Sequence, residues 1–522
     1  MSPFSCALIS VYDKTNILPL AQELKRWGVE ILSTGGTAAM LREAGISVVE
    51  VSEYTGFPEL MGGRVKTLHP KVHAGILMRE EGDDRVQLEA IGGKPIDLVV
   101  VNLYPFESAL AQKASLPEAI ELIDVGGVAL VRAAAKNYAR VTVVVDPSDY
   151  QALIEVIQKG QKPSIEWRKQ LAAKAFGLTA AYDATIADHL SRKEGDGGEV
   201  LFPSQLILRL EQWTALRYGE NPHQRAALYT YPHAKECFAK AAQVGAGGKE
   251  LSYNNLLDGD AGWALVSEFE LPAAAIIKHA TPCGVATASV VSEAYQRARD
   301  ADPVSAFGGV VALNRVVDGL TAKLILETFI ECVVAPGYEA EAIDLLRRRK
   351  NLRLLEVGAR GVSGGVVLQL RSIDGGVLVQ EVDRNAEGEV RKGRVVTKRF
   401  PTEEEWVGLE FAWKVAKHVK SNAIVVAQAR GPYAETVGIG GGQTSRIGSV
   451  EIAVKGREDK VRGSVLASDG FFPFPDGVEA AAAMGIAAIV QPGGSVRDEE
   501  VVARADEFGI AMVLTGRRHF RH

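Results

Sequence analysis

A glycine-rich stretch near the start of the chain has the composition of an anion-binding turn. It reads Ser33, Thr34, Gly35, Gly36, Thr37 and stands between an apolar run and a helical pattern. Such a turn presents free backbone N–H groups and the positive end of a helix dipole to an anion. Two interpretations fit this motif, a phosphate-binding turn and an ordinary turn whose hydroxyl groups cap the helix.

Lys14 favours the phosphate-binding interpretation. It follows the first apolar run of the chain, and parallel sheets bind ligands at the carboxyl ends of their strands. We therefore expect Lys14 to lie at the same sheet edge as the glycine-rich turn.

A second stretch, residues 62–70, contains two cations and a hydroxyl group, Arg64, Lys66 and Thr67, without helical or strand periodicity. A structural loop does not need two neighbouring cations, whereas an anionic substrate or a developing oxyanion does. Further along come Asn102 and Tyr104, then Asp124 with a glycine pair, and finally Lys136. Taken singly, each of these residues is more often structural than functional.

In the second half of the chain, Lys278 and His279 stand where an apolar run ends and a turn begins. Strand ends are where a scaffold exposes catalytic groups. A histidine titrates near neutral pH and can act as a general base, which predicts a catalytic role for His279.

Other motifs in this half exclude some chemistries and leave others open. The Pro282-Cys283 pair lacks the His-x-Glu partner of zinc deaminases, so we expect no zinc. Residues 438–446 lack the ending of a P-loop, although Ser445 and Arg446 can hold a phosphate. Residues 471–475 fit both an ordinary core turn and an aromatic ligand slot.

The elements that must position these residues follow from the hydrophobic pattern. Short β-branched runs alternate with amphipathic stretches over the first 200 residues, which predicts an α/β fold with an open parallel sheet covered by helices. The expected strands are residues 6–10, 30–33, 48–51, 97–102 and 140–145. The expected helices are residues 17–27, 38–44, 117–123 and 166–190.

Composition bounds the organisation. A length of 522 residues exceeds one ordinary core. A charged, glycine-rich stretch over residues 191–198 predicts a linker, giving domains 1–197 and 198–522. A second weak point is expected over residues 347–365, where a basic cluster is interpreted as a solvated helix end, and this divides the second domain into lobes 198–365 and 366–522.

The overall composition also excludes several functional classes. The chain is 47% hydrophobic and 24% charged, which is typical of soluble globular proteins. A net charge of −6 argues against nucleic-acid binding. The four scattered cysteines fit a reducing cytoplasm, and we expect no targeting or membrane segment.

The motifs of the first domain occur, in order, over about residues 5–195 in a pattern that resembles the inosine monophosphate (IMP) cyclohydrolase family, which has a methylglyoxal-synthase-like fold. The resemblance implies closure of formylated aminoimidazole carboxamide ribotide (FAICAR) to IMP with loss of water, and neither a metal nor a cofactor. It implies that Lys66 stabilises the oxyanion and that Tyr104, Asp124 and Lys136 relay protons. The implied substrate-binding residues are Ser10, Lys14, Ser33, Thr34, Gly35, Gly36, Thr37, Arg64, Thr67, Asn102, Gly126 and Gly127.

Residues 200–522 resemble the family of aminoimidazole carboxamide ribotide (AICAR) formyltransferases. The resemblance implies a duplicated cytidine-deaminase-like fold without zinc, a homodimer, and 10-formyltetrahydrofolate as formyl donor. A potassium ion is bound in some members. The implied catalytic residues are Lys278, His279, Asn422 and His522. The implied substrate-binding residues are Arg217, Tyr218, Phe307, Gly308, Glu331, Gln443, Ser445, Arg446, Phe471, Pro473, Asp476 and Arg518.

The whole chain is thereby identified as a member of the bifunctional family that performs the last two steps to IMP. Its expected ligands are AICAR, FAICAR, IMP and folate. The segment 448–468 is shorter than in members that carry an insertion there. One alternative remains, since the methylglyoxal-synthase-like fold also serves as a regulatory sensor. The set Lys66, Tyr104, Asp124 and Lys136 favours the enzyme, because a phosphate sensor does not require it.

Overall fold

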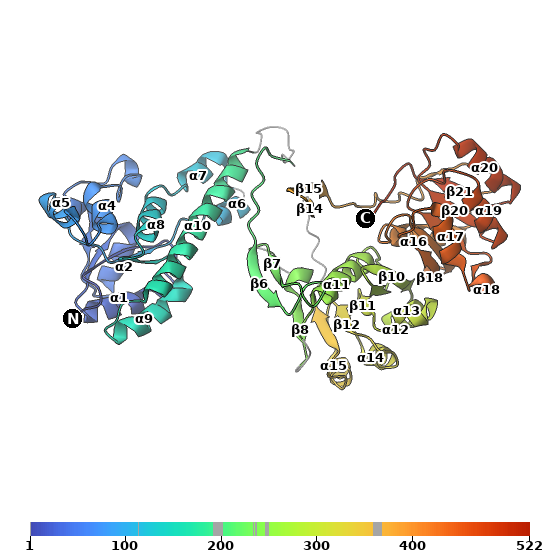
Figure 1. Ribbon diagram of the computed structural model, residues 1–522, viewed down its shortest axis with the longest axis horizontal. Coiled ribbons are helices and arrows are strands. Elements are labelled where there is room, and N and C mark those ends of the chain that lie inside the picture. Colours follow the sequence, from blue (N-terminus) through green and yellow to red (C-terminus); the bar gives the residue numbers. More distant parts are fainter. Residues whose placement is uncertain are drawn as a thin grey trace. The chain divides into compact units, whose positions relative to one another are not determined.

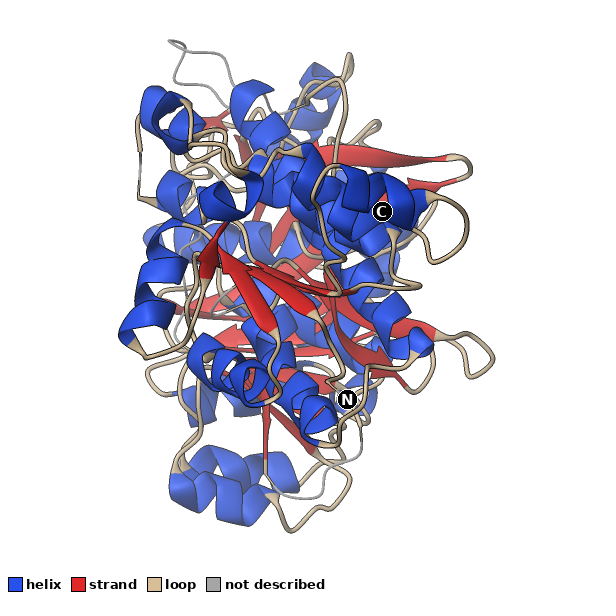
Figure 2. Ribbon diagram, turned by 90° about the vertical axis from the view of Figure 1, so that its left-hand side faces the viewer, coloured by secondary structure: helices blue, strands red, loops and turns tan. Residues whose placement is uncertain are grey.

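The computed structural model describes residues 2–112, 114–191, 202–232, 234, 237–245, 250–358 and 368–522. The chain divides into two compact units, Met1–Arg209 and Leu210–His522; Figure 1 colours it from blue at its beginning to red at its end. The boundaries predicted between residues 197 and 198, and between 365 and 366, lie outside the described residues. Both units contain helices and strands, which are blue and red in Figure 2.

The first unit contains a five-stranded sheet of order β3-β2-β1-β4-β5, and every neighbouring pair is parallel. The five strands correspond to the five predicted ones: β1 (Cys6–Ser10), β2 (Glu30–Ser33), β3 (Val49–Glu50), β4 (Leu98–Val101) and β5 (Thr142–Val144). The prediction of an open parallel sheet is therefore confirmed.

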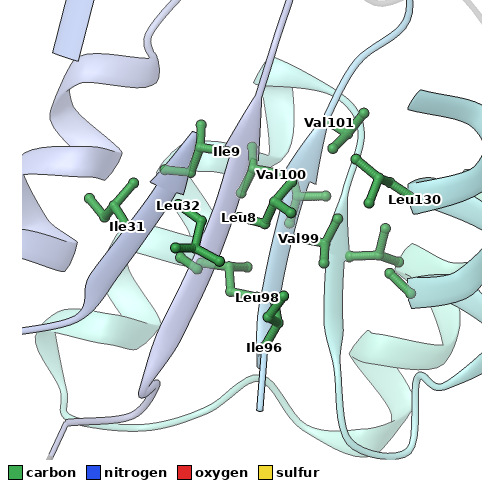
Figure 3. Close-up of a cluster of buried hydrophobic side chains, with 14 of the residues drawn as sticks. Leu8, Ile9, Ile31, Leu32, Ile96, Leu98, Val99, Val100, Val101 and Leu130 are labelled. Carbon is green, nitrogen blue, oxygen red and sulfur yellow. The ribbon is translucent and has the colours of Figure 1, made fainter. Parts of the chain in front are cut away.

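The core of this unit surrounds β1 and β4. Leu8, Leu98 and Val100 have no exposed surface, and Figure 3 shows these strand residues packed side by side with Leu130 of a covering helix. Strands buried on both faces are continuous apolar runs, which is why their sequence pattern was readable.

The four predicted helices of the first unit are present, and others surround the sheet. One boundary differs, because the glycine-rich turn already belongs to the helix that begins at Gly35. The helices are α1 (Ile17–Arg26), α2 (Gly35–Glu43), α3 (Val51–Thr55), α4 (Pro70–Leu77), α5 (Asp84–Ala90), α6 (Phe106–Ala111), α7 (Leu116–Glu121), α8 (Gly126–Lys136), α9 (Tyr150–Gln158) and α10 (Ile165–Ser191).

The second unit is built on a twelve-stranded sheet of order β16-β21-β20-β19-β17-β18-β10-β9-β11-β12-β13-β8. Its strands are β8 (Ala242–Val244), β9 (Ala273–Lys278), β10 (Thr281–Thr287), β11 (Val310–Leu313), β12 (Cys332–Ala335), β13 (Arg353–Glu356), β16 (Arg394–Val395), β17 (Ile424–Arg430), β18 (Tyr433–Gly440), β19 (Val465–Ser468), β20 (Ala488–Gln491) and β21 (Ala511–Leu514). Two hairpins stand outside it: β6 (Glu211–Leu216) with β7 (Ala226–Thr230), and β14 (Leu368–Ile373) with β15 (Gly376–Glu381).

The sheet contains the same arrangement twice. The order β10-β9-β11-β12-β13 in one half repeats as β18-β17-β19-β20-β21 in the other, with the same pattern of antiparallel and parallel pairs. The halves join where β10 pairs with β18. Two threonines bridge this seam: Val285 N donates to Thr436 Oγ1 at 3.0 Å and Ala434 N to Thr287 Oγ1 at 2.9 Å. The two expected lobes therefore share one continuous sheet.

Helices cover both faces of this sheet. On one face, α11 (Tyr253–Val266) and α16 (Glu403–Ala416) share a single core cluster that extends across both halves. On the other face each half has a cluster of its own. The helices there are α12 (Val291–Ala301), α14 (Gly319–Leu326) and α15 (Ala340–Leu346) in the first half, and α17 (Arg446–Val454), α19 (Asp476–Ala483) and α20 (Asp498–Glu507) in the second. Two short helices, α13 (Pro303–Ala306) and α18 (Glu458–Val461), complete the unit.

The weak point expected over residues 347–365 is partly wrong. Arg347 is the C-cap of α15, which agrees with the interpretation of the basic cluster as a helix end. Residues 353–356, however, form β13, a strand of the main sheet that is hydrogen-bonded on both sides. This strand is only four residues long, with two apolar residues between Arg353 and Glu356, so it gave little signal in a stretch chosen for its basic and glycine-rich ends.

Candidate functional site

The first unit has a cavity of about 590 Å³ at the carboxyl edge of its sheet. Residues just beyond β1, β2 and β4 line it, together with the beginnings of α2 and α8. This is the edge at which parallel sheets bind ligands. The predicted residues that line the cavity are Ser10, Lys14, Thr34, Gly35, Gly36, Thr37, Arg64, Lys66, Thr67, Asn102, Tyr104, Asp124, Gly126 and Gly127.

Two lysines converge on the N-terminus of α2 within this cavity. A side-chain carbon placed on Gly36 would lie 3.8 Å from Lys14 Nζ, and one on Gly35 would lie 3.7 Å from Lys66 Nζ. The Ser10 and Thr34 hydroxyl oxygens are 2.9 Å apart at the same place. Two ammonium groups, hydroxyl groups and the positive end of a helix together suit a phosphate group.

The cations of residues 61–67 are neutralised by carboxylates that the sequence did not indicate. Arg64 pairs with Glu121, which also lines the cavity. Lys66 Nζ lies 3.2 Å from Glu59 Oε2. Both pairs are at least partly exposed, so an anionic ligand can exchange with the carboxylates at little cost.

Asn102 holds the loop that carries Lys14. Its Oδ1 accepts hydrogen bonds from the backbone N–H groups of Tyr12 and Asp13 at 2.6 and 3.0 Å, and its Nδ2 donates to Asp13 O at 2.9 Å. Tyr104 stacks edge-on against Tyr12, with ring centroids 5.6 Å apart, and its side chain remains exposed. Asn102 thus shapes the cavity, whereas the Tyr104 hydroxyl is free to reach a ligand.

Asp124 is an acid of the cavity whose carboxyl is largely removed from solvent. Its Oδ1 accepts a hydrogen bond of 2.7 Å from Gly127 N at the beginning of α8. Burial raises the pKa of this carboxyl, and the Gly127 N–H only partly offsets the rise. A side-chain carbon on Gly126 would lie 2.9 Å from Thr67 Oγ1, so the glycine lets α8 approach the cationic loop closely.

Two predicted residues do not line the cavity. The Ser33 side chain is buried and donates a hydrogen bond of 2.6 Å to Ile9 O within the sheet. Lys136 is exposed at the last turn of α8, whose first turn reaches the cavity. At 1.5 Å per residue these two ends are about 15 Å apart. The glycine pair begins a helix that carries Lys136 away from the cavity.

In the second unit, the predicted residues gather along one edge of the main sheet. We call it the site edge and define it by the end of β9 at Lys278 and the start of β17 at Ile424. Strand pairing places Thr281 opposite Lys278, Ile424 opposite Gly440 and Ser468 opposite Ile424. Phe307, Gly308 and Glu331 directly precede β11 and β12, which start at this edge.

Lys278 and His279 lie in the middle of the site edge. Lys278 Nζ donates a hydrogen bond of 3.0 Å to Phe307 O. His279 and Ala280 form the two-residue turn between β9 and β10, and both have a φ of 56°. Residues other than glycine occupy this left-handed region at a cost of order 1–3 kcal/mol each. The exposed His279 side chain therefore sits on a strained turn that its surroundings must hold.

Asp258 of α11 is a neighbour of this turn that the sequence did not indicate. Its Oδ1 accepts a hydrogen bond of 2.6 Å from Ala280 N. Burial raises the pKa of Asp258, with Glu331 adding to the rise and the N–H groups and imidazole of the turn opposing it. Glu331 Oε2 in turn accepts from Asn255 Nδ2 at 3.2 Å.

A second group at the site edge centres on Arg446. Its guanidinium donates to Asp469 Oδ1 at 2.6 Å, Ser468 Oγ at 2.7 Å and Asn422 Oδ1 at 2.8 Å. Asn422 Nδ2 donates to Gln443 O at 2.9 Å. The Arg446 side chain is only 7% exposed, so this arginine orders its neighbours rather than offering a free cation.

The C-terminal residues pass close to this group. Ser421 N donates to Arg521 O at 2.9 Å and His519 N to Asp469 O at 3.1 Å. Arg518 stacks on Phe520 at 4.6 Å, and the rings of Phe520 and His522 are 6.1 Å apart. The structure thus brings Arg518 and His522 to the same edge as Asn422, although no motif spacing linked them.

The remaining predicted residues lie at the margins of the site edge. Phe471 is 40% exposed, and Asp476 begins α19. Ser445 caps α17, accepting from Gly448 N at 3.2 Å. Arg217 stacks on Tyr218 at 4.6 Å, and their loop contacts α11 through Asn254 Nδ2, which donates to Glu220 O at 3.2 Å. Pro473 lies in the turn between Phe471 and α19.

No group of three or more histidine, cysteine or carboxylate side chains suited to a metal ion occurs among the described residues. Cys283 is a thiol, since burial raises its pKa to about 12, and its Sγ donates to Ile276 O. None of the helices in the described part of the chain combines the length and apolarity needed to cross a bilayer.

Comparison with known proteins relates both units to characterised families. The family described as "AICARFT/IMPCHase bienzyme" matches residues 134–456, and the one described as "MGS-like domain" matches residues 16–129. The bifunctional purine biosynthesis protein PurH of Sorangium cellulosum (strain So ce56) is 55% identical over 523 residues, covering 99% of each chain.

Two further relatives show the same similarity along the whole chain. The PurH proteins of Bacillus subtilis (strain 168) and Myxococcus xanthus (strain DK1622) are 49% and 52% identical, over 521 and 526 residues. Each match covers 99% of this chain and at least 99% of the relative.

Proposed function

The chain belongs to the AICARFT/IMPCHase bienzyme family, and we propose that its two units divide that family's two reactions between them. It is a bifunctional enzyme of purine biosynthesis, an AICAR formyltransferase and IMP cyclohydrolase. The first unit contains the MGS-like domain and is proposed to close the ring. The second is proposed to transfer the formyl group.

The cavity of the first unit carries the assignment of ring closure. In this reaction the carboxamide nitrogen of FAICAR attacks the formyl carbon, the formyl oxygen gains negative charge, and water then leaves. The ribotide phosphate would bind at the N-terminus of α2 beside Lys14. Lys66, whose ammonium lies near both that helix end and Glu59, would stabilise the oxyanion.

Proton transfer is assigned to Asp124 and Tyr104, which line the same cavity. Asp124 would take the carboxamide proton as the new C–N bond forms, and the exposed Tyr104 hydroxyl would protonate the oxyanion. Asp124 would then pass its proton to the same oxygen, which leaves as water, while the former formamide nitrogen gives up its N–H proton and restores the Tyr104 hydroxyl. A buried carboxyl with a raised pKa is a better base than an ordinary aspartate. Lys136, about 15 Å along α8, has no place in this relay within one chain.

Formyl transfer is assigned to the site edge of the second unit. The family implies 10-formyltetrahydrofolate as co-substrate. The 5-amino group of AICAR would attack its formyl carbon while His279 removes the amine proton. Lys278 would stabilise the oxyanion or protonate the departing folate nitrogen. The observation that carries this assignment is the projection of His279 from a strained turn beside Lys278.

The remaining properties implied by the family are proposals as well. We propose a duplicated cytidine-deaminase-like fold for the second unit, a homodimer, and a cytoplasmic location. The exposed aromatic side chain of Phe307 at the site edge, 60% accessible in a single chain, suits a site completed by a second copy. Ser33, which is buried, is retained as a support of the phosphate turn rather than as a ligand.

A bound potassium ion, where the family has one, would find a ligand in Asp469. Its Oδ2 is buried and has no hydrogen-bond partner among the residues that the structure describes, while Oδ1 accepts from Arg446. Cations of this kind are held by oxygen ligands. The ion would support the position of Asp469 and hence of the C-terminal residues.

The proposal is tested with the full-length chain. FAICAR alone tests ring closure, and AICAR with 10-formyltetrahydrofolate tests the combined route. The variants Lys66→Ala and His279→Asn should each remove one reaction and leave the other. A first unit that binds FAICAR without forming IMP would be a sensor, and loss of both reactions in either variant would contradict two separate sites.

A further inference from the structure

We infer that Asp258 is a positioning residue for formyl transfer, holding the His279 turn through a hydrogen bond to the backbone. This inference rests on the role proposed for His279. The carboxylate does not need to touch either substrate. Its task is to keep the imidazole of His279 where the amine proton is removed.

The turn needs an external support because its backbone is strained. Two-residue hairpin turns with positive φ at both positions are normally built from asparagine and glycine. Here they are built from His279 and Ala280, both with a φ of 56°. Such a conformation persists only when its surroundings over-determine it, and it is typical of functional sites.

Asp258 supplies that support from a helix fixed on the sheet. Its Oδ1 accepts the Ala280 N–H at 2.6 Å. Helix α11 packs closely against its neighbours at two glycines. A side-chain carbon added at Gly259 would lie 2.7 Å from Phe238, and one at Gly262 would lie 2.8 Å from Ala312, so the helix has little room to shift. The carboxylate is therefore a stationary acceptor, directed at the residue after His279.

The other side of the turn is anchored independently. Lys278 Nζ donates to Phe307 O at 3.0 Å, which ties the end of β9 to the segment before β11. His279 thus lies between two fixed points. Removing the acceptor on one side should let the turn relax toward ordinary backbone angles, and misplacement of a catalytic group by about 1 Å can cost about 100-fold in rate.

Two substitutions separate the hydrogen bond from the charge. Asp258→Asn keeps an oxygen acceptor for Ala280 N and removes the charge, whereas Asp258→Ala removes both. For Asp258→Ala we expect kcat of formyl transfer to fall about 10- to 100-fold with little change in KM for AICAR. For Asp258→Asn we expect kcat within about threefold of wild type, since a neutral acceptor still binds the N–H.

The matched controls are Asp318→Asn and Asp318→Ala. Asp318 also accepts a hydrogen bond from a backbone N–H, that of Thr321 at 2.7 Å. It is the N-cap of α14 and follows the far end of β11, so it lies at the edge of the sheet opposite the site edge. Both controls should retain formyl transfer. Thermal unfolding and circular dichroism, measured on the same preparations, show that each variant chain is folded in both units, and IMP formation from FAICAR shows that the first unit is active.

Each outcome decides the inference. Wild-type kcat in Asp258→Ala, or equal loss in Asp258→Asn and Asp258→Ala, would overturn it, the second result indicating that the charge acts directly. A large rise in KM at unchanged kcat would also overturn it, because it indicates substrate binding. His279→Asn is measured in parallel: if that variant keeps formyl transfer, the proposed function fails, independently of Asp258.

Discussion

The ammonium group of Lys278 donates a hydrogen bond of 3.0 Å to the carbonyl oxygen of Phe307. An ammonium group has three donors, so this contact fixes the side chain and leaves two donors for a ligand. Lys278 can therefore stabilise a developing oxyanion without first leaving its resting position. Such preorganisation is the usual source of large electrostatic contributions to catalysis.

Lys66→Ala should lower the rate of ring closure about 10²- to 10³-fold, because it removes the ammonium proposed to stabilise the oxyanion. Initial rates of IMP formation from FAICAR measure the change. Formyl transfer by the same preparation should be unaffected. Lys25→Ala is the control, since Lys25 is exposed on α1 and its Nζ donates a hydrogen bond to Gly45 O, away from the cavity. Near-normal ring closure by Lys66→Ala would remove Lys66 from this role.

His279→Asn should lower formyl transfer about 10²- to 10⁴-fold through loss of the general base. Asparagine accepts the left-handed conformation better than most residues, so the turn should be preserved. Ala280→Gly is the companion variant. It relieves the strain at a φ of 56° and should keep activity while raising the thermal stability. Equal loss of ring closure in His279→Asn would contradict the division between the units.

Asp124→Asn should stabilise the first unit and slow ring closure. Burial raises the pKa of Asp124, so the ionised form is disfavoured by folding, and stability is lost as pH rises from the ordinary value of 3.8 through the raised value. The asparagine oxygen can still accept from Gly127 N. Thermal unfolding at neutral pH should therefore show a higher midpoint than wild type, and a lower midpoint would contradict the cost assigned to the buried charge.

His519 should make the position of the C-terminal residues dependent on pH. Its Nδ1 lies 2.7 Å from Asp383 Oδ2 and its Nε2 3.2 Å from Glu389 Oε1. Burial opposes the charge of His519, but these two carboxylates outweigh it and raise the pKa above 6.5. The stabilisation is complete below about pH 6.5 and is lost as pH rises through the raised pKa.

The corresponding measurement compares wild type with His519→Gln. Thermal stability of the wild type should exceed that of the variant at acidic pH, and the difference should shrink as pH rises above neutrality. Formyl transfer should follow the same trend relative to the variant, because His519 N holds Asp469 O beside Asn422 and Arg446. A difference that is constant with pH would assign His519 a neutral packing role.

Glu268→Gln should destabilise the second unit by about 3–5 kcal/mol at neutral pH, because it leaves Lys417 buried without its ion-pair partner. Lys417 Nζ lies 2.5 Å from Glu268 Oε1. Burial alone would raise the pKa of Glu268, but His418 and Lys417 lower it to about 2. The difference should vanish as pH falls from 4.5 to about 2. Glu507→Gln, in an exposed pair with Arg504, should change the denaturant midpoint little.

The sequence revealed elements and motifs wherever the signal is local. Short β-branched runs, several of them continuously apolar, identified every strand of the first sheet, and residues directly after β1, β2 and β4 line the cavity. Contacts that depend on tertiary packing could not be predicted from such local patterns. Glu121 and Asp258 lie 57 and 22 residues from the groups they contact, and Glu59 meets Lys66 only through the fold of the loop between them.

Three predicted site residues have surroundings that their local motifs did not indicate. Ser33 ends a buried strand, where its hydroxyl has a carbonyl partner in the sheet. Lys136 stands at the last turn of a helix whose first turn carries the glycine pair at the cavity. Arg446 was expected to hold a phosphate, and its buried guanidinium pairs with Asp469. For Ser33 and Arg446, satisfaction of a buried polar group outweighed the local motif.

The seam between β10 and β18 determines how the second unit can be divided. Separating its halves would turn these two strands, of seven and eight residues, into open edges with unpaired N–H and C=O groups. Long open edges of this kind promote self-association through strand pairing. A gene fragment encoding either half should therefore yield an aggregating product, and a protease that cuts between the halves should leave them joined.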